Sequence, residues 1–175
     1  MRRSTAAVGS SVFMALAPGT VAGVVPWWVT GWQTGQWWLP VRLLGAGVLL
    51  AGAVVLVHAF ARFVGEGLGT PAPVAPTEHL VVGGLYRHVR NPMYVAVTAS
   101  VGGQALLLGR PVLLTYGLLA GTVMWAFAKW YEEPKLLRTF GAEYETYRRA
   151  VPGWWPRLRP WQGDTPARTT GPPSP

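Results

Sequence analysis

The sequence contains no cysteine and few charged residues. None of its 175 residues is Cys, and only 13% are Asp, Glu, Lys or Arg. The absence of Cys excludes disulfide bonds, thiolate catalysis and Cys-ligated metal or iron–sulfur sites. The charged fraction is about half that of ordinary soluble domains, whereas 50% of the residues are apolar. This composition predicts an integral membrane protein.

Acidic residues are scarcer than basic ones, with 7 Asp and Glu against 15 Lys and Arg and a net charge of +8. No basic stripe lies on a polar domain, so we expect no nucleic-acid partner; an anionic lipid surface is the simpler partner. Several of the 10 Trp residues lie near the ends of apolar stretches, as in membrane-interface belts. These are Trp27, Trp28, Trp32, Trp37, Trp38 and Trp130.

Four apolar stretches are long enough to cross roughly 30 Å of hydrocarbon. They cover about residues 10–29, 41–64, 93–109 and 111–131, and the third is near the lower length limit. Only a short turn at Arg110 separates the last two, which predicts a helical hairpin. A cleaved signal peptide is the alternative for the first stretch, but signal peptides have shorter apolar regions, so we favour a retained span.

The basic residues predict the orientation of these spans. With four spans and both termini in the cytoplasm, every Lys and Arg except Arg42 and Arg110 lies on the cytoplasmic side. The positive-inside rule favours this topology. The expected fold is therefore all-α, a polytopic bundle of about four transmembrane helices in a bacterial-type inner or plasma membrane.

A further helix is expected on the cytoplasmic side, over about residues 133–150. Apolar residues recur there every three or four positions, which predicts an amphipathic helix ended by Pro152 and Gly153. Such a helix lies either on the membrane surface or against the bundle. Residues 157–175 are rich in Pro, Thr and Gly and are expected to be a disordered tail, which leaves a single domain over 1–156. The apolar positions are Leu136, Phe140, Tyr144, Tyr147 and Val151.

Polar residues gather where the third span begins. Asn91 suits a helix N-cap and Pro92 the first helical position, so a simple helix start explains both. Yet Arg87, His88 and Arg90 crowd the same helix N-terminus, which itself favours anions. The cluster therefore predicts either an anion-binding site or an anchor for lipid headgroups.

Two carboxylates, Glu132 and Glu133, directly follow the fourth span. The hairpin topology places them at the depth of Arg90, where groups of both signs would suit a zwitterionic ligand; solvated membrane flanks are the alternative. Near the cytoplasmic end of the second span, His58 and Arg62 are substrate-site candidates, because ionisable groups inside membranes are usually functional. The alternative for His58 is a side chain that only reaches toward the membrane interface. No pair of His residues has metal-ligand spacing, so we expect no metal site.

Two segments, YRHVRNPMY over 86–94 and EEPKLLRTFGAEYETY over 132–147, together resemble the isoprenylcysteine carboxyl methyltransferase and phospholipid methyltransferase superfamily. The resemblance covers about residues 80–156. It implies an enzyme that transfers a methyl group from S-adenosylmethionine to a lipophilic acceptor at the cytoplasmic membrane face. The acceptor is a lipid amine, or a prenylated or other lipophilic carboxylate or thiol. Position 91 is Asn where isoprenylcysteine enzymes usually have His, which argues against a prenylated-protein acceptor.

The resemblance also implies residue roles. A sulfonium methyl is already activated, so the protein needs only to align the acceptor and exclude water. An amine acceptor must be neutral, and Glu132, Glu133 or His58 could take its proton. Arg138 could orient a carboxylate acceptor. The implied cofactor-binding residues are Tyr86, His88, Arg90, Asn91, Tyr94 and Glu132, and the implied catalytic residues are Glu132, Glu133 and Arg138.

Two other functions remain open from the sequence. One is an NADPH-dependent membrane reductase of the sterol-reductase kind, whose C-terminal region is distantly similar. The other is a lipid-binding or assembly protein without catalytic activity. The sequence leaves the methyl acceptor and the oligomeric state undetermined.

Overall fold

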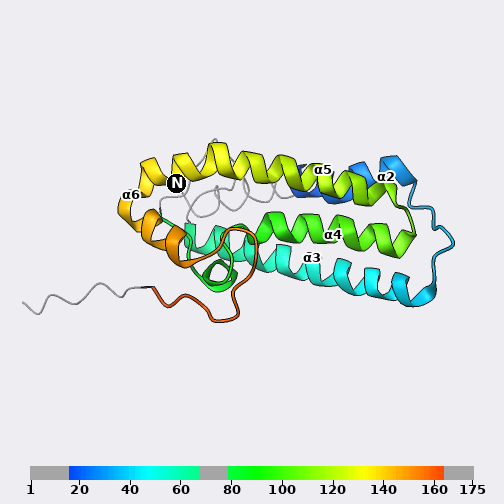
Figure 1. Ribbon diagram of the computed structural model, residues 1–175, viewed down its shortest axis with the longest axis horizontal. Helices are drawn as coiled ribbons and strands as arrows, with labels where there is room; N and C mark the ends of the chain where they lie inside the picture. The colour runs from blue at the N-terminus through cyan, green and yellow to red at the C-terminus, as the bar shows by residue number, and fades with distance from the viewer. Residues whose placement is uncertain (1–15, 68–78, 164–175) are drawn as a thin grey trace, which may run out of the picture.

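The computed structural model describes residues 16–67 and 79–163, and over these ranges the chain is all-α with no strand (Figure 1). This agrees with the expected fold class. In chain order, with η marking 3-10 or π helix, the elements are η1 (Thr20–Val24), α2 (Val25–Thr30), α3 (Leu39–Gly67), η2 (Gly84–Arg87), α4 (Pro92–Leu108), α5 (Val112–Phe127), η3 (Ala128–Glu132) and α6 (Glu133–Ala150).

Two stretches of helix in the described ranges are long and apolar enough to cross a membrane. They are Leu39–Arg62 and Val112–Ala150. The second has 39 residues and exceeds the roughly 20 residues that a bilayer requires, so only part of it lies in hydrocarbon. Helix α4 is apolar but shorter, with 17 residues. The first expected span, 10–29, begins outside the described residues, and the count of four spans stays a prediction.

Helices α3 and α4 lie side by side with their backbones in close approach (Figure 1). A methyl group added at Gly103 would lie 2.5 Å from the Leu49 amide nitrogen, and one at Gly52 would lie 2.5 Å from Ser100 Oγ. A methyl group at Gly45 would meet the backbone of α4. Small residues thus allow the tight helix contact that is common in membrane proteins.

The helical hairpin predicted around Arg110 is confirmed. Helix α4 ends at Leu108 and is capped by Gly109, whose φ of 64° is a left-handed conformation that glycine adopts readily, and α5 begins at Val112. Across the hairpin, a methyl group at Gly117 would lie 3.1 Å from Val101 Cγ1. The hairpin brings the start of α4 and the end of α5 to the same end of the bundle (Figure 1).

Beyond α5 the helix continues through η3 into α6 and then bends at Gly141, where φ is 52° and ψ is −124°. Figure 1 shows the second part of α6 turning back toward the start of α4. The chain after α6, residues 151–163, then runs back along the bundle end; we call it the return segment. Its residues 157–163, expected in a disordered tail, are instead held against the domain by backbone hydrogen bonds from Arg157 and Trp161. Residues 164–175 of that expected tail lie outside the described residues.

Candidate functional site

The start of α4 differs from a simple helix start. Pro92 occupies the first turn as expected, and Asn91 occupies the N-cap position. The Asn91 side chain, however, makes no capping bond; its Nδ2 donates to the carbonyl oxygen of Gly153 at 3.1 Å. Helix capping therefore does not explain the asparagine, whose amide faces the return segment.

The basic cluster before α4 faces backbone carbonyl groups. Arg87 Nε donates to the carbonyl oxygen of Trp161 at 2.5 Å, and Arg90 Nε to that of Val151 at 3.0 Å. His88 Nδ1 lies 2.8 Å from the Arg157 carbonyl oxygen, which can only accept, so this nitrogen carries a proton. The sequence predicted an anion or headgroup site here, but in the structure these groups hold the return segment.

Backbone hydrogen bonds strengthen the same contact. The amide of Arg90 donates to the Pro152 carbonyl at 2.9 Å, and that of Asn91 to the Gly153 carbonyl at 3.2 Å. In the other direction, the Arg157 amide donates to the His88 carbonyl at 3.0 Å. The return segment is therefore fixed in register against the residues that begin α4.

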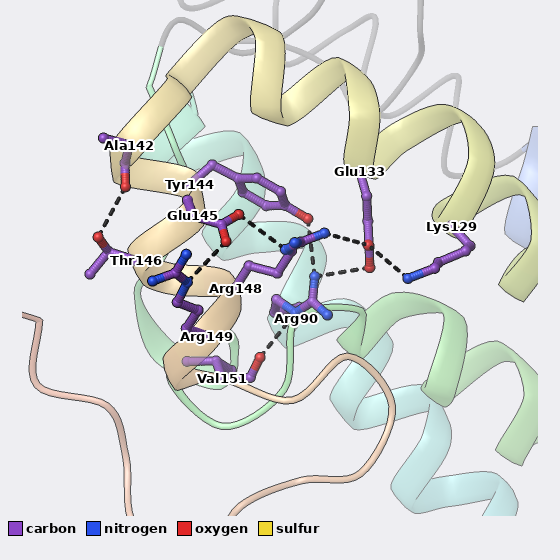
Figure 2. Close-up of polar contacts among 10 residues, drawn as sticks. All are labelled: Arg90, Lys129, Glu133, Ala142, Tyr144, Glu145, Thr146, Arg148, Arg149 and Val151. Carbon is purple, nitrogen blue, oxygen red and sulfur yellow. Dashed lines mark hydrogen bonds and ion pairs between the residues drawn. The ribbon is translucent and has the colours of Figure 1, made fainter.

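Glu133 lies at the centre of a charged network (Figure 2). Arg90 Nη1 donates to Glu133 Oε1 at 2.9 Å and to the Tyr144 hydroxyl at 3.0 Å. Lys129 Nζ and Arg148 Nη1 each lie 3.7 Å from Glu133 Oε2. The side chains of Arg90 and Glu133 are only 14% and 12% exposed. The predicted proximity of Arg90 to the two glutamates is thus confirmed for Glu133, which has both oxygens engaged by protein cations.

Glu132 has different surroundings. Consecutive helical residues point about 100° apart, and here Glu132 accepts a hydrogen bond from the Tyr94 hydroxyl at 2.7 Å through Oε1. The ring of Tyr94 stacks on that of Trp154, with centroids 6.2 Å apart and planes 13° apart. No other hydrogen bond to the Glu132 carboxylate occurs among the described residues, so Oε2 keeps its capacity to accept one.

Burial sets the electrostatics of this carboxylate, which lies just past the apolar run that ends at Tyr131. Burial raises the pKa of Glu132, the Tyr94 hydrogen bond opposes that rise, and the neighbouring charge of Glu133 adds to it. Glu132 also closes η3, a π-helical turn. Such turns are rare in proteins overall, and those that occur are often found at functional sites.

The second part of α6 completes the surroundings of Arg90. Tyr144 and Tyr147 are buried, and burial raises the pKa of both hydroxyls, so both stay protonated at neutral pH. The Tyr147 hydroxyl donates to the Tyr86 carbonyl at 2.6 Å. The five apolar residues predicted on one side of this helix belong to one cluster, which also includes Leu80, Val82, Ala150 and Trp161.

Three predicted residues form no hydrogen bond or ion pair with the two glutamates. Arg138 is exposed on α6 and makes no hydrogen bond or ion pair with another described residue. His58 and Arg62 are exposed on α3 beside η2: a methyl group at Gly84 would lie 3.4 Å from His58 Nε2 and 3.2 Å from Arg62 Nε. Their assigned roles remain predictions.

Sequence reasoning missed Trp154, Lys129 and Arg148 as neighbours of the glutamate pair. Lys129 precedes Glu133 by one helical turn, a spacing that favours an ion pair and was a usable signal. Trp154 had no comparable signal, because its stacking on Tyr94 depends on where the return segment runs.

Apolar helices long enough to cross a membrane, with a partly buried carboxylate and stacked rings at one end of the bundle, are the arrangement expected of an integral membrane enzyme. The chain matches the family model "Phospholipid methyltransferase" over residues 41–143, more than half of its length, and belongs to that family. The resemblance inferred from the two motifs is thereby confirmed.

One relative matches over a shorter region. The chain is 39% identical over 82 residues to the Protein-S-isoprenylcysteine O-methyltransferase of Schizosaccharomyces pombe. The match covers 45% of this chain and 34% of that protein, so the chain spans only about a third of its length.

Proposed function

We propose that this chain transfers a methyl group from S-adenosylmethionine to a lipophilic acceptor at the cytoplasmic face of the membrane. The observation that carries the proposal is the environment of Glu132. Its carboxylate is partly buried and bonded to Tyr94, whose ring stacks on Trp154, and no described residue donates to its second oxygen. The adjacent Glu133, in contrast, is fully engaged by Arg90, Lys129 and Arg148.

The residues present fit the chemistry of S-adenosylmethionine. The molecule offers an ammonium group, ribose hydroxyls, a carboxylate, an aromatic base and a sulfonium cation. Glu132 can accept from the ammonium or from a ribose hydroxyl. The rings of Tyr94 and Trp154 can stack on the base or face the cation. Arg90 Nη2, which donates to no other described residue, can bind a carboxylate.

Bound S-adenosylmethionine supplies an electrophilic methyl group, so this chain has mainly to bind, orient and exclude water. In the proposal, Glu132 holds the polar part of the cofactor, and the paired Glu133 and Arg90 keep the end of η3 fixed against the start of α4. For an amine acceptor, Glu132 or His58 takes the proton that the nucleophile releases. For a carboxylate acceptor no base is needed, and Arg138 orients it.

The proposal also includes the membrane topology of the chain. Four spans with both termini in the cytoplasm place the glutamate pair where a cytosolic cofactor reaches it, while the bundle admits the acceptor from the bilayer. Residues 1–156 form one methyltransferase domain in this proposal, to which the return segment adds Trp161 and its neighbours.

Calorimetric titration tests the cofactor. We expect the protein in lipid nanodiscs to bind S-adenosylmethionine and not NADPH. Glu132→Gln should weaken binding, whereas Glu143→Gln, at an exposed position on α6, should not. Binding of NADPH alone would overturn the proposal in favour of a reductase.

Methyl transfer tests the activity. Incubation with S-adenosylmethionine carrying a labelled methyl group and a total lipid extract should label one lipid fraction. A lipid-binding scaffold would leave every fraction unlabelled. Mass spectrometry of the labelled fraction then identifies the acceptor and distinguishes transfer to nitrogen, oxygen and sulfur.

A further inference from the structure

The return segment exposes two large apolar side chains despite its fixed backbone. Trp155 is 82% exposed and Leu158 is 98% exposed. The hydrogen bonds from Arg87, His88 and Arg90 hold the backbone on either side of them. Both side chains are therefore held outward, toward something other than this domain.

The hydrogen-bond pattern gives the depth of these side chains relative to the membrane. Pro152 and Gly153 accept from the amides of Arg90 and Asn91, immediately before the apolar helix α4 (Figure 1). Arg90 in turn pairs with Glu133, just past the apolar part of α5. The return segment thus lies at the level where two apolar helices end, which is the membrane boundary of a protein in this family.

The exposed aromatic residues at the end of α5 lie near the same level. Trp130 is 72% exposed and Tyr131 is 45% exposed. Both immediately precede the glutamate pair. Indole and phenol rings prefer the headgroup region, because it accommodates an apolar ring and a polar N–H or O–H together.

The charge of the return segment complements an anionic surface. Residues 151–163 contain Arg157 and Arg159 and no acidic residue, and Arg159 is exposed. A second copy of the same segment would bring like charges together, whereas anionic phosphate groups would neutralise them. The bilayer is thus the occupant that both the apolar and the charged side chains favour.

We propose that the return segment is a membrane-interface contact, with Trp155 and Leu158 inserted at the boundary of headgroups and acyl chains. Arg159 meets the phosphate groups of anionic lipids. Because the same segment carries Trp154 onto Tyr94, the membrane contact fixes one wall of the candidate site.

The absence of cysteine allows a direct test, since a single introduced Cys is the only labelling site. We would label Leu158→Cys with an environment-sensitive fluorophore, in nanodiscs that hold one protein molecule and contain spin-labelled lipids. The exposed side chain makes this substitution compatible with folding. Thr146→Cys, exposed on the polar side of α6, is the matched control.

We expect blue-shifted emission and loss of intensity by spin-label quenching at position 158, and neither at position 146. Equal emission and equal quenching at the two positions would overturn the proposal. So would a blue shift that appears only in discs holding two protein molecules, which would indicate contact between copies. The measurement needs no methyl donor, so its failure is distinct from a failure of the proposed activity.

The lipid charge is tested in the same discs. Quenching of the label at position 158 should increase when phosphatidylglycerol replaces part of the phosphatidylcholine, and Arg159→Gln should remove that increase. Quenching that is independent of lipid charge would overturn the role given to Arg159. Adding Trp155→Ser should reduce the quenching, because the second inserted side chain is lost.

Discussion

At both ends of the helix bundle, arginines hold neighbouring segments through backbone carbonyls, but among the described residues acidic side chains occur at only one end. At the end where α4 meets α5, Arg42 Nε donates to the Leu107 carbonyl at 3.0 Å and Arg110 Nε to the Gln33 carbonyl at 3.0 Å. At the opposite end, Arg90 Nε donates to the Val151 carbonyl, also at 3.0 Å. The 7 acidic residues are all at or after position 66, and none lies between 79 and 131.

This difference separates structural from functional requirements. The hairpin end shows that arginines and backbone carbonyls suffice to join two helices, and two loops, without any carboxylate. At the end that carries the two glutamates, Glu133 strengthens the equivalent contact, because it forms an ion pair with Arg90. Glu132 forms no ion pair with another described residue; it is partly buried and bonded to Tyr94, and only the nearby charge of Lys135 offsets its own. This environment is the reason why our proposal gives the ligand-binding role to Glu132 and not to Glu133.

The largest expected effect is a loss of protein stability when the contacts around Glu133 are broken. Arg90→Ala leaves Glu133 buried without its closest cation, and we expect it to lower the free energy of unfolding by about 3–5 kcal/mol. Arg42→Ala removes one hydrogen bond to a carbonyl and should cost about 1 kcal/mol. Denaturant unfolding in detergent micelles measures both. Equal losses would remove the distinction between the ends.

The next effect concerns the two glutamates. Glu132→Gln should weaken S-adenosylmethionine binding about 10- to 100-fold, the value of one hydrogen bond to a charged group. The free energy of unfolding of this variant should change little, because partial burial already disfavours the ionised carboxylate that the substitution removes. Glu133→Gln should instead lower stability, since three cations each lose an ion pair, although Arg148 keeps its pair with Glu145. Calorimetry and unfolding of both variants give the comparison; a reversed pattern would exchange the two roles.

Close packing toward the hairpin end gives a smaller effect. A methyl group at Gly45 collides with the backbone of α4, so Gly45→Ala should lower the free energy of unfolding by about 1–3 kcal/mol. At Gly47 nothing lies within 4 Å, and Gly47→Ala should be neutral or stabilising. Thermal unfolding of the pair tests this. A loss at Gly47 equal to that at Gly45 would point to helix flexibility instead of packing.

The smallest expected effect is a change in pH dependence. The Tyr94 hydrogen bond lowers the pKa of Glu132 against the raising effect of burial, so Tyr94→Phe should raise that pKa further. Cofactor binding that needs the ionised carboxylate is lost as the pH falls through this pKa. The acidic limb of the binding profile should therefore move to higher pH in Tyr94→Phe. An unchanged limb would mean that another group controls it.

The elements that sequence predicts well here are those set by local periodicity or simple topology. The regular apolar stretches predicted the positions of α4, α5 and the apolar side of α6. The predicted hairpin placed Arg90 and Glu133 at the same depth. Arg138 was placed near the glutamates by distance along the chain, but six helical residues rotate by about 240° relative to Glu132. That rotation is consistent with its exposed position.

The return segment could not be predicted, because its bonds are to backbone carbonyls, which every residue offers. The side chains of Arg87 and His88 therefore suggested an external anion, although Trp161 and Arg157 provide the acceptors. Asn91 likewise suggested a helix cap while its amide donates to Gly153. Composition alone placed residues 157–163 in a tail, since prolines and arginines carry no sign of long-range pairing.

The long separation between these bonded groups also sets an order of events during synthesis. Arg87, His88 and Arg90 leave the ribosome before their carbonyl partners, which follow 61 to 74 residues later in the chain. The hairpin of α4 and α5 can be inserted in that interval, while the basic groups are still hydrated. We therefore expect the contact of Trp154 with Tyr94 to form after α4 and α5 have been inserted, which would make it one of the last contacts of the candidate site to form.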